Sequence, residues 1–329
     1  MRILLANPRG FCAGVDRAIS IVEEALERFG APVYVRHEII HNRHVINNLA
    51  RRGVSFVDSL QDVPFGSVVI FSAHGVAPEV WREAEDRELL VFDATCPLVA
   101  KVHMEVIRLA RENRECILIG HAGHQEVIGT LAHYRHLCAE GIYLVGTAAE
   151  AAVLELNNPH TAAYVTQTTL SHEQVANVVD VLQQRYPWLR SASRKADICY
   201  ATQNRQDAVK QLALEADVIL VVGSANSSNA NRLREVAELC GVEAYLIDDA
   251  SQLKNQWLHE KNAIGITAAA STPSWLVEEL IEALRLQGAS DIRQLDGDEE
   301  NIIFPMPAVL SQRNRPVHRA MAAAKSQHA

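Results

Sequence analysis

Three cysteines stand at points where the sequence turns into a helix-like run. They are Cys12 in GFCAGVDRAI, Cys96 in DATCPLVAKV and Cys199 in DICYATQNRQ. The N-terminus of a helix favours the thiolate form of cysteine, and Pro97 after Cys96 is typical of a first helical position. Thiolates bind metals, so three of them brought together by the fold predict a three-ligand metal site.

The other three cysteines have no such setting. Cys116 opens a predicted strand, Cys240 closes a predicted helix before a glycine, and Cys138 lies in HLCAEG without a matched context. We interpret these as ordinary small side chains. The six cysteines are scattered along the chain, and disulfide bonds are the weaker interpretation in a reducing compartment.

Zinc and iron–sulfur sites are the two candidates for three thiolates. Structural zinc sites usually contain a short C-x-x-C spacing, which this chain lacks. His124 and Glu126 form half of a zinc deaminase signature, but the P-C-x-x-C half is absent. A [4Fe–4S] cluster normally takes four cysteines, and three would leave one iron open to a substrate oxygen. The sequence therefore favours a cluster that performs chemistry over one that only carries electrons.

The elements around the cysteines alternate between apolar strand-like runs and helix-like runs, which predicts βαβ units and parallel sheets. The predicted strands are VYVRHEI at 33–39, VVIFSA at 68–73, CILIGH at 116–121, AAYVTQ at 162–167, VILVVGS at 218–224 and AIGITA at 263–268. Helix-period runs such as SHEQVANVVDVLQQRY and SSNANRLREVAELC follow most of these strands.

A weak internal repeat relates three parts of the chain. A polar turn follows each of the three cysteines after 28 or 29 residues, and a second turn follows 33 or 44 residues later. The first turns contain His41, His124 and Ser227, and the second turns contain His74, Thr168 and Ser271. Open α/β sheets bind ligands at the carboxyl ends of their strands, where these turns belong.

The repeat predicts the fold class: three similar α/β domains with mostly parallel sheets, arranged pseudo-threefold around a central iron–sulfur cluster. We expect domains at 14–96, 97–195 and 196–290, with the N-terminal strand 1–13 joining the third. Residues 291–329 are expected to form a C-terminal extension. About the last 20 residues lack apolar periodicity and are predicted to be a mobile tail.

Composition narrows the function classes. The chain has 329 residues and a formal net charge of -9, which argues against non-specific nucleic-acid binding. No run approaches the roughly 18 consecutive apolar residues of a membrane span, and the N-terminus does not read as a signal peptide. We expect a cytoplasmic protein that contacts neither nucleic acid nor membrane.

The polar turns carry hydrogen-bond donors at predicted helix N-termini, which bind phosphate groups readily. A diphosphate is therefore the expected ligand. Glu126 is the one carboxylate in this donor-rich region, and it is a candidate proton donor. Alternatives remain for each group: helix capping for the hydroxyl residues, structural hydrogen bonds for the histidines, and for Glu126 a solvated charge or a salt bridge to one of the histidines. The candidate donors are His41, His74, His124, Thr168, Ser227, Ser228, Asn229 and Ser271.

A family resemblance is carried by the motifs NPRGFCAGV, SAHGV, DATCPLV, HAGHQEV, TQTTLS, DICYATQNRQ and GSANSSN. Through these motifs the chain closely resembles the 4-hydroxy-3-methylbut-2-enyl diphosphate reductase family from residue 1 to about residue 305. These enzymes catalyse the last step of the methylerythritol phosphate route to isoprenoids. The resemblance implies that two electrons and two protons convert the allylic alcohol into isopentenyl and dimethylallyl diphosphates plus water.

The resemblance also implies roles for individual residues. Cys12, Cys96 and Cys199 would hold one [4Fe–4S] cluster whose fourth iron binds the substrate hydroxyl. Glu126, with His124 and Thr168, would serve catalysis and proton delivery. The diphosphate site implied by the resemblance consists of His41, His74, His124, Ser227, Ser228, Asn229 and Ser271, with Thr168 near the reacting hydroxyl.

One position departs from the family pattern. The family usually reads T-A-G-A-S near Ser271, whereas this chain has Ala269 in place of the glycine. If that position requires a positive φ, we expect a strained turn.

The sequence also lacks a G-x-G-x-x-G nucleotide fingerprint after a strand, so the electron donor is expected to be ferredoxin or flavodoxin. A cluster-dependent dehydratase without net electron transfer and a non-catalytic iron–sulfur sensor remain as rival functions.

Overall fold

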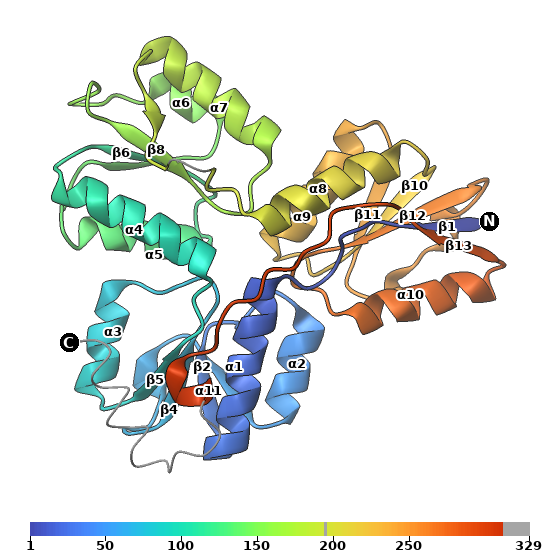
Figure 1. The fold of residues 1–329 in the computed structure, drawn as a ribbon, viewed down its shortest axis with the longest axis horizontal. Coiled ribbons are helices and arrows are strands. Elements are labelled where there is room, and N and C mark those ends of the chain that lie inside the picture. Colours follow the sequence, from blue (N-terminus) through green and yellow to red (C-terminus); the bar gives the residue numbers. More distant parts are fainter. Residues whose placement is uncertain (194–195, 312–329) are drawn as a thin grey trace.

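Three parallel β-sheets, each flanked by helices, form three lobes that meet at the centre of the molecule (Figure 1). The computed structural model describes residues 1–193 and 196–311. The predicted mobile tail lies largely outside these described residues. All six predicted strands are present, and both helix-period runs quoted above are helices.

The first domain has a four-stranded sheet in the order β3-β2-β4-β5. Its elements are α1 (Ala13–Phe29), β2 (Val33–Arg36), α2 (Arg43–Arg51), β3 (Val54–Val57), β4 (Val68–Phe71), α3 (Pro78–Asp86) and β5 (Leu90–Asp93). The spacing of apolar residues along α1 places Val15, Ala18, Ile21, Val22 and Ala25 in the core of this domain.

The second domain repeats this arrangement with the order β7-β6-β8-β9. Its elements are α4 (Pro97–Arg111), β6 (Cys116–Ile119), α5 (Gln125–Arg135), β7 (Ile142–Val145), α6 (Ala148–Val153), β8 (Ala163–Thr166), α7 (His172–Arg185) and β9 (Arg190–Ser191). Every residue of β6 is buried, as expected for a parallel strand covered on both faces.

The third domain has a five-stranded sheet in the order β11-β10-β12-β1-β13. Its elements are β1 (Arg2–Leu5), α8 (Tyr200–Ala213), β10 (Val218–Val222), α9 (Ser228–Leu239), β11 (Glu243–Ile247), β12 (Ala263–Ala268), α10 (Ser274–Leu286) and β13 (Asp291–Gln294). The first strand of the chain thus completes the last sheet, with Leu4 beside Gly265.

The three domains share a common core of elements. In each, a cysteine-capped helix leads into a central strand (β2, β6 or β10), and the next central strand (β4, β8 or β12) pairs with it. The predicted fold of three similar, mostly parallel α/β domains is confirmed. The domain boundaries stay a prediction, and β13 lies inside the segment that we expected to be an extension.

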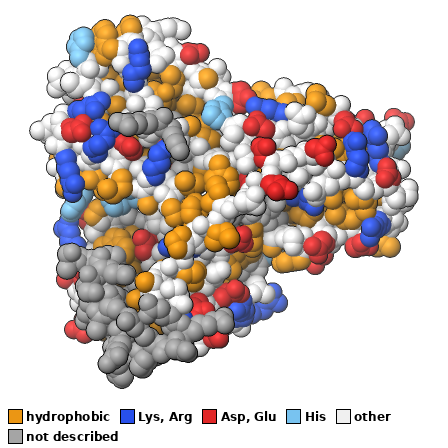
Figure 2. All heavy atoms as spheres, in the orientation of Figure 1, with side chains coloured by type: hydrophobic (Ala, Val, Ile, Leu, Met, Phe, Trp, Pro, Cys, Tyr) orange, Lys and Arg blue, Asp and Glu red, His pale blue; other side chains and the backbone are white. Residues whose placement is uncertain are grey.

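Residues 295–311 run from β13 across the centre of the molecule to α11 (Ala308–Ser311), which lies beside α1 (Figure 1). We call residues 295–311 the C-terminal strap. Leu310 at its end is buried in the core of the first domain. On the face shown in Figure 2, acidic and basic side chains intermingle, and hydrophobic side chains gather near the centre.

No helix within the described ranges has the length and apolar character needed to cross a membrane.

Candidate iron–sulfur and diphosphate site

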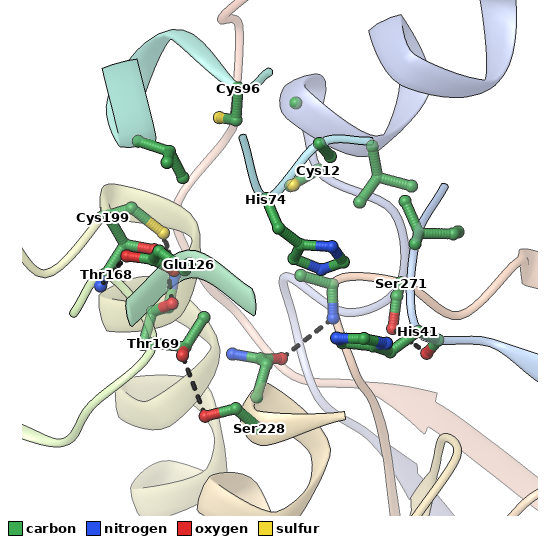
Figure 3. A pocket seen from close by; sticks show the side chains of 18 of the residues that line it. Cys12, His41, His74, Cys96, Glu126, Thr168, Thr169, Cys199, Ser228 and Ser271 are labelled. Atoms are coloured by element: carbon green, nitrogen blue, oxygen red, sulfur yellow. Dashed lines mark hydrogen bonds between the residues drawn. The ribbon is translucent and has the colours of Figure 1, made fainter. Parts of the chain in front are cut away.

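Each of the three predicted cysteines is the N-cap residue of a helix. Cys12 caps α1, Cys96 caps α4 and Cys199 caps α8. All three side chains line one cavity of about 110 Å³ at the junction of the domains (Figure 3). This volume has room for several waters and therefore exceeds what one metal ion needs.

Gly14 leaves the space between two of these sulfurs open. A Cβ at this position would lie 2.7 Å from Cys96 Sγ and 3.8 Å from Cys12 Sγ. A glycine in the first turn of α1 therefore lets both thiols approach the helix backbone. Within the described part of the chain, no three His, Cys, Asp or Glu side chains are grouped closely enough to hold a single metal ion.

Burial outweighs the helix dipole in setting the protonation of these thiols. Removal from water raises the pKa of Cys96 to about 12 and that of Cys199 to about 11, and it also raises the pKa of Cys12. Backbone N–H groups in the first turns of the helices lower these pKa values, as expected, but burial has the larger effect. A bound cation is needed to favour the thiolate form of these side chains.

Thr202 is a site residue that the sequence analysis missed. Its hydroxyl lies 3.1 Å from Cys199 Sγ, and its backbone N–H donates to the same sulfur at 3.3 Å. The signal was present in the sequence, because an N-cap side chain accepts from the residue three positions later. Hydrogen bonds to a cluster sulfur ligand are among the factors that tune its reduction potential.

Three histidines form one wall of the cavity. The rings of His41 and His74 stack with centroids 4.2 Å apart, and the His124 ring meets each of them edge-on at 5.7 Å. Burial, reinforced by the neighbouring histidines, lowers the pKa of His74 well below its usual value and that of His124 to about 4. His74 and His124 are therefore neutral near pH 7, and each can donate through one ring nitrogen.

Hydrogen bonds orient two of these rings. The backbone N–H of Glu126 donates to His124 Nδ1 at 3.2 Å, so the ring proton is on Nε2. His41 Nδ1 lies 2.8 Å from Glu38 Oε2, which leaves its Nε2 free to face a ligand. Glu38 is held in turn by Asn226 Nδ2 at 2.8 Å.

The carboxyl group of Glu126 is buried, and both of its hydrogen bonds come from a single residue. Its Oε1 accepts from the backbone N–H of Thr168 at 2.7 Å, and its Oε2 accepts from the Thr168 hydroxyl at 2.9 Å. Burial raises the pKa of Glu126 to about 7, against the opposing effect of these hydrogen bonds. The carboxyl can therefore hold or release a proton near neutral pH. The alternative of a salt bridge to a histidine is not borne out by the carboxyl contacts of Glu126 in the described residues.

The third domain contributes hydroxyl and amide groups. Ser227 Oγ caps α9, which bears out the capping alternative for this residue. Ser228 Oγ accepts from Thr169 Oγ1 at 2.9 Å, a contact between the third and second domains. Asn229 Oδ1 accepts from the backbone N–H of Ala270 at 2.9 Å. These contacts fix the side chains at the N-terminus of α9 toward the cavity.

The turn that carries Ser271 accommodates its alanine. Ala269 is buried and does not adopt a positive φ, so the expected strain is absent. Its N–H donates to Val222 O at 3.0 Å, which holds the turn against β10. Ser271 Oγ donates to His41 O at 2.9 Å and thereby links the third domain to the first.

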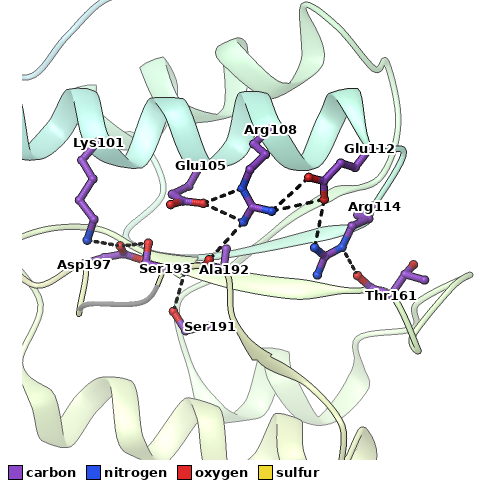
Figure 4. A network of polar contacts seen from close by, with 10 residues as sticks. All are labelled: Lys101, Glu105, Arg108, Glu112, Arg114, Thr161, Ser191, Ala192, Ser193 and Asp197. Carbon is purple, nitrogen blue, oxygen red and sulfur yellow. Dashed lines mark hydrogen bonds and ion pairs between the residues drawn. The ribbon is translucent and has the colours of Figure 1, made fainter.

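An ion pair between Lys101 and Asp197 joins α4 to the segment that leads to Cys199 (Figure 4). Lys101 on α4 donates to Asp197 Oδ1 at 3.3 Å, and Asp197 also accepts from Ser193 Oγ and from Thr166 N. Lys101 lies one turn after Cys96, and Asp197 lies two residues before Cys199. This contact therefore fixes the Cys96 helix relative to the Cys199 loop.

Thus all twelve site residues predicted from the sequence line the same cavity.

The family model described as LytB protein matches residues 3–285. The chain belongs to the LytB family. It is 58% identical over 310 residues to the 4-hydroxy-3-methylbut-2-enyl diphosphate reductase of Alcanivorax borkumensis, covering 94% of this chain and 99% of that protein. The corresponding reductase of Pseudomonas aeruginosa is 56% identical over 310 residues and is covered to 98%.

Solved structures of LytB-like reductases agree with this assignment. The Plasmodium falciparum E-1-hydroxy-2-methyl-but-2-enyl-4-diphosphate reductase superposes with a TM-score of 0.86 at 36% identity, covering 100% of this chain and 99% of that one. A second reductase structure, described as the terminal enzyme of the non-mevalonate pathway, gives a TM-score of 0.63 at 34% identity. That match covers 87% of this chain and all of the other.

Proposed function

We propose that this chain catalyses the reductive dehydroxylation of (E)-4-hydroxy-3-methylbut-2-enyl diphosphate. Two electrons and two protons break the C–O bond and give isopentenyl diphosphate or dimethylallyl diphosphate plus water. The observation that carries the proposal is the convergence on one cavity of three cysteine-capped helices and a buried carboxyl with a pKa of about 7. Membership of the LytB family supports the same substrate.

The cofactor is proposed to be one [4Fe–4S] cluster held by Cys12, Cys96 and Cys199. The donor set fits this group, because three sulfurs from three helices border a cavity larger than one ion needs, and Gly14 keeps the space beside two of them open. When bound, the cluster would supply the electrons and an open iron that acts as a Lewis acid.

The diphosphate is proposed to bind opposite the cysteines, among the histidines and the N-terminus of α9. His74 and His124 offer ring N–H donors, the Nε2 of His41 faces the same space, and hydroxyl and amide groups are added by Ser227, Ser228, Asn229 and Ser271. No Lys or Arg lines this cavity within the described residues. Binding therefore depends on hydrogen bonds and the helix dipole, and it favours protonation of the histidines.

Proton delivery is proposed to run from Glu126 through the Thr168 hydroxyl. The hydroxyl touches Glu126 Oε2 at 2.9 Å and also faces the cavity, so it can pass a proton without moving the carboxyl. Closure of the polar turns around the diphosphate would exclude water from the reacting carbon.

The electrons are proposed to come from a separate ferredoxin or flavodoxin, and the reaction is proposed to take place in the cytoplasm. The lack of a nucleotide fingerprint in the sequence supports an external donor.

One anaerobic assay tests the function. Reconstituted protein is given the hydroxylated diphosphate with and without a reduced electron donor, and products are measured by mass spectrometry. The reductase requires the donor, whereas a dehydratase would turn over without it and a sensor would give no product in either arm. Iron and acid-labile sulfide analysis of the same sample tests the cluster itself.

A further inference from the structure

The buried guanidinium of Arg205 connects two of the cysteine loops with the C-terminal strap. Arg205 is fully buried in the second turn of α8, the helix that Cys199 caps. Its Nε donates to Gly10 O at 2.9 Å, and its Nη2 donates to Gly10 O at 2.7 Å and to Phe11 O at 3.0 Å. These two carbonyl groups immediately precede Cys12.

Glu300 of the strap completes the coordination of this guanidinium. Its Oε1 accepts from Arg205 Nη1 at 2.9 Å, and its Oε2 accepts from both terminal nitrogens at 3.2 Å. A buried guanidinium needs a paired anion with this kind of geometry, because isolated charges are costly to remove from water. The strap therefore supplies the counter-charge for the cation behind the Cys12 loop.

Two further contacts hold the strap against the same N-terminal segment. A Cβ on Gly297 would lie only 1.8 Å from Asn7 O, so the strap backbone touches the loop that leads to Cys12. Farther along, Arg17 on α1 donates to Pro305 O at 2.8 Å. The contact of the strap with the Cys12 region is thus continuous and does not depend on one side chain.

We propose that Glu300 and Arg205 are positioning residues that clasp the Cys12 loop to the Cys199 helix and so retain the iron–sulfur cluster. This inference rests on the proposed cofactor. It assigns the strap a role in cofactor retention, in addition to its role in packing α11 on the first domain.

The test compares Glu300→Gln with Glu299→Gln, its exposed neighbour, in the reconstituted full-length protein. We expect Glu300→Gln to lose its cluster to a chelator about 10- to 100-fold faster than wild type, as for other residues that orient metal ligands. Glu299→Gln should lose it at the wild-type rate. Visible absorption and iron content follow the loss, and neither requires turnover.

The reduction potential separates positioning from a general loss of packing. Removing the negative charge in Glu300→Gln should shift the potential to more positive values, whereas removing the positive charge in Arg205→Gln should shift it to more negative values. A purely structural defect would not give shifts of opposite sign. Wild-type loss rates and potentials in both variants would overturn the proposal.

If either single variant fails to fold, Arg205→Met combined with Glu300→Met removes both charges and leaves no uncompensated ion. This double variant should fold and still release the cluster faster, because the Gly10 and Phe11 carbonyls have lost their donors. If the double variant retained its cluster as long as wild type, the proposed positioning role of Arg205 and Glu300 would be overturned. A wild-type protein that takes up no iron and sulfide would instead overturn the proposed cofactor, so the two failures are distinct.

Discussion

Thr168 donates to both carboxyl oxygens of Glu126, once through its backbone N–H at 2.7 Å and once through its hydroxyl at 2.9 Å. One residue thus fixes the plane of the carboxyl and provides the only hydroxyl in contact with it among the described residues. The backbone donor remains after any substitution at position 168 except proline, whereas the hydroxyl can be removed separately.

The first prediction concerns Glu126. Glu126→Gln keeps the shape of the side chain but cannot donate a proton in the same way, so we expect kcat to fall by about 10²- to 10⁴-fold. The dissociation constant of the diphosphate substrate, measured by calorimetry, should stay within about threefold. Thr168→Val should lower kcat by a smaller factor, since it removes only the hydroxyl. Near-normal turnover by Glu126→Gln would contradict the proton-donor role.

The second prediction is a pH profile. The pKa of Glu126 is raised to about 7 by burial, so the fraction that carries a proton falls as the pH rises through that value. If the protonated form is the donor, kcat/KM should decline about tenfold per unit above pH 7. The decline should be absent from the residual activity of Glu126→Gln. A profile that rises across this range would mean that the carboxylate form is required.

The third prediction concerns the diphosphate. His41→Asn should raise KM and the dissociation constant by about 10- to 100-fold, the range expected for a lost hydrogen bond to a charged group. The matched control is His37→Asn, because His37 lies outside the cavity and bonds Asp58 at the surface. Asn tolerates the positive φ found at position 37. Unchanged binding by His41→Asn would remove it from the diphosphate site.

The fourth prediction concerns the space beside the sulfurs. A Cβ in Gly14→Ala would come within 2.7 Å of Cys96 Sγ, so we expect iron content after reconstitution to fall below half of the wild-type value. Gly129→Ala is the control, because it also lies in a helix and its Cβ would make only ordinary contacts, the shortest at 3.6 Å. Equal iron content in the two variants would show that the cluster does not need this space.

The fifth prediction separates the three proposed ligand cysteines from an exposed cysteine. Serine at Cys12, Cys96 or Cys199 should abolish the visible absorption of the cluster and lower kcat by more than about 10³-fold, since an oxygen ligand binds iron less well than sulfur. Serine at the exposed Cys240 should change neither. A full complement of iron in any of the three site variants would contradict the three-ligand arrangement.

Local sequence signals were sufficient for most of the fold. The β-branched runs marked the central strands, and the turn spacing after each cysteine revealed the threefold repeat. Glycine and proline near Cys12 and Cys96 marked the helix starts, which the structure confirms. The same periodicity indicated the site, because equivalent turns of parallel sheets lie at equivalent places.

The features that escaped prediction depend on tertiary packing. The pKa values of the thiols follow from burial, which overrides the local helix dipole, and burial cannot be read from the neighbours of Cys96 in the sequence. The strand β13 is short and largely polar, so its pairing with β1 left no alternating pattern. The Arg205–Glu300 pair joins residues 95 positions apart, and two charged residues so distant carry no sequence signal of contact.

The place of β1 between β12 and β13 has a consequence for biosynthesis. This strand and the Cys12 loop behind it are translated well before the partners of the strand, residues 263–268 and 291–294. The strand must therefore stay unpaired until the third domain has been translated. If Cys12 is a cluster ligand, as proposed, insertion of the cluster at this loop would follow translation of the third domain.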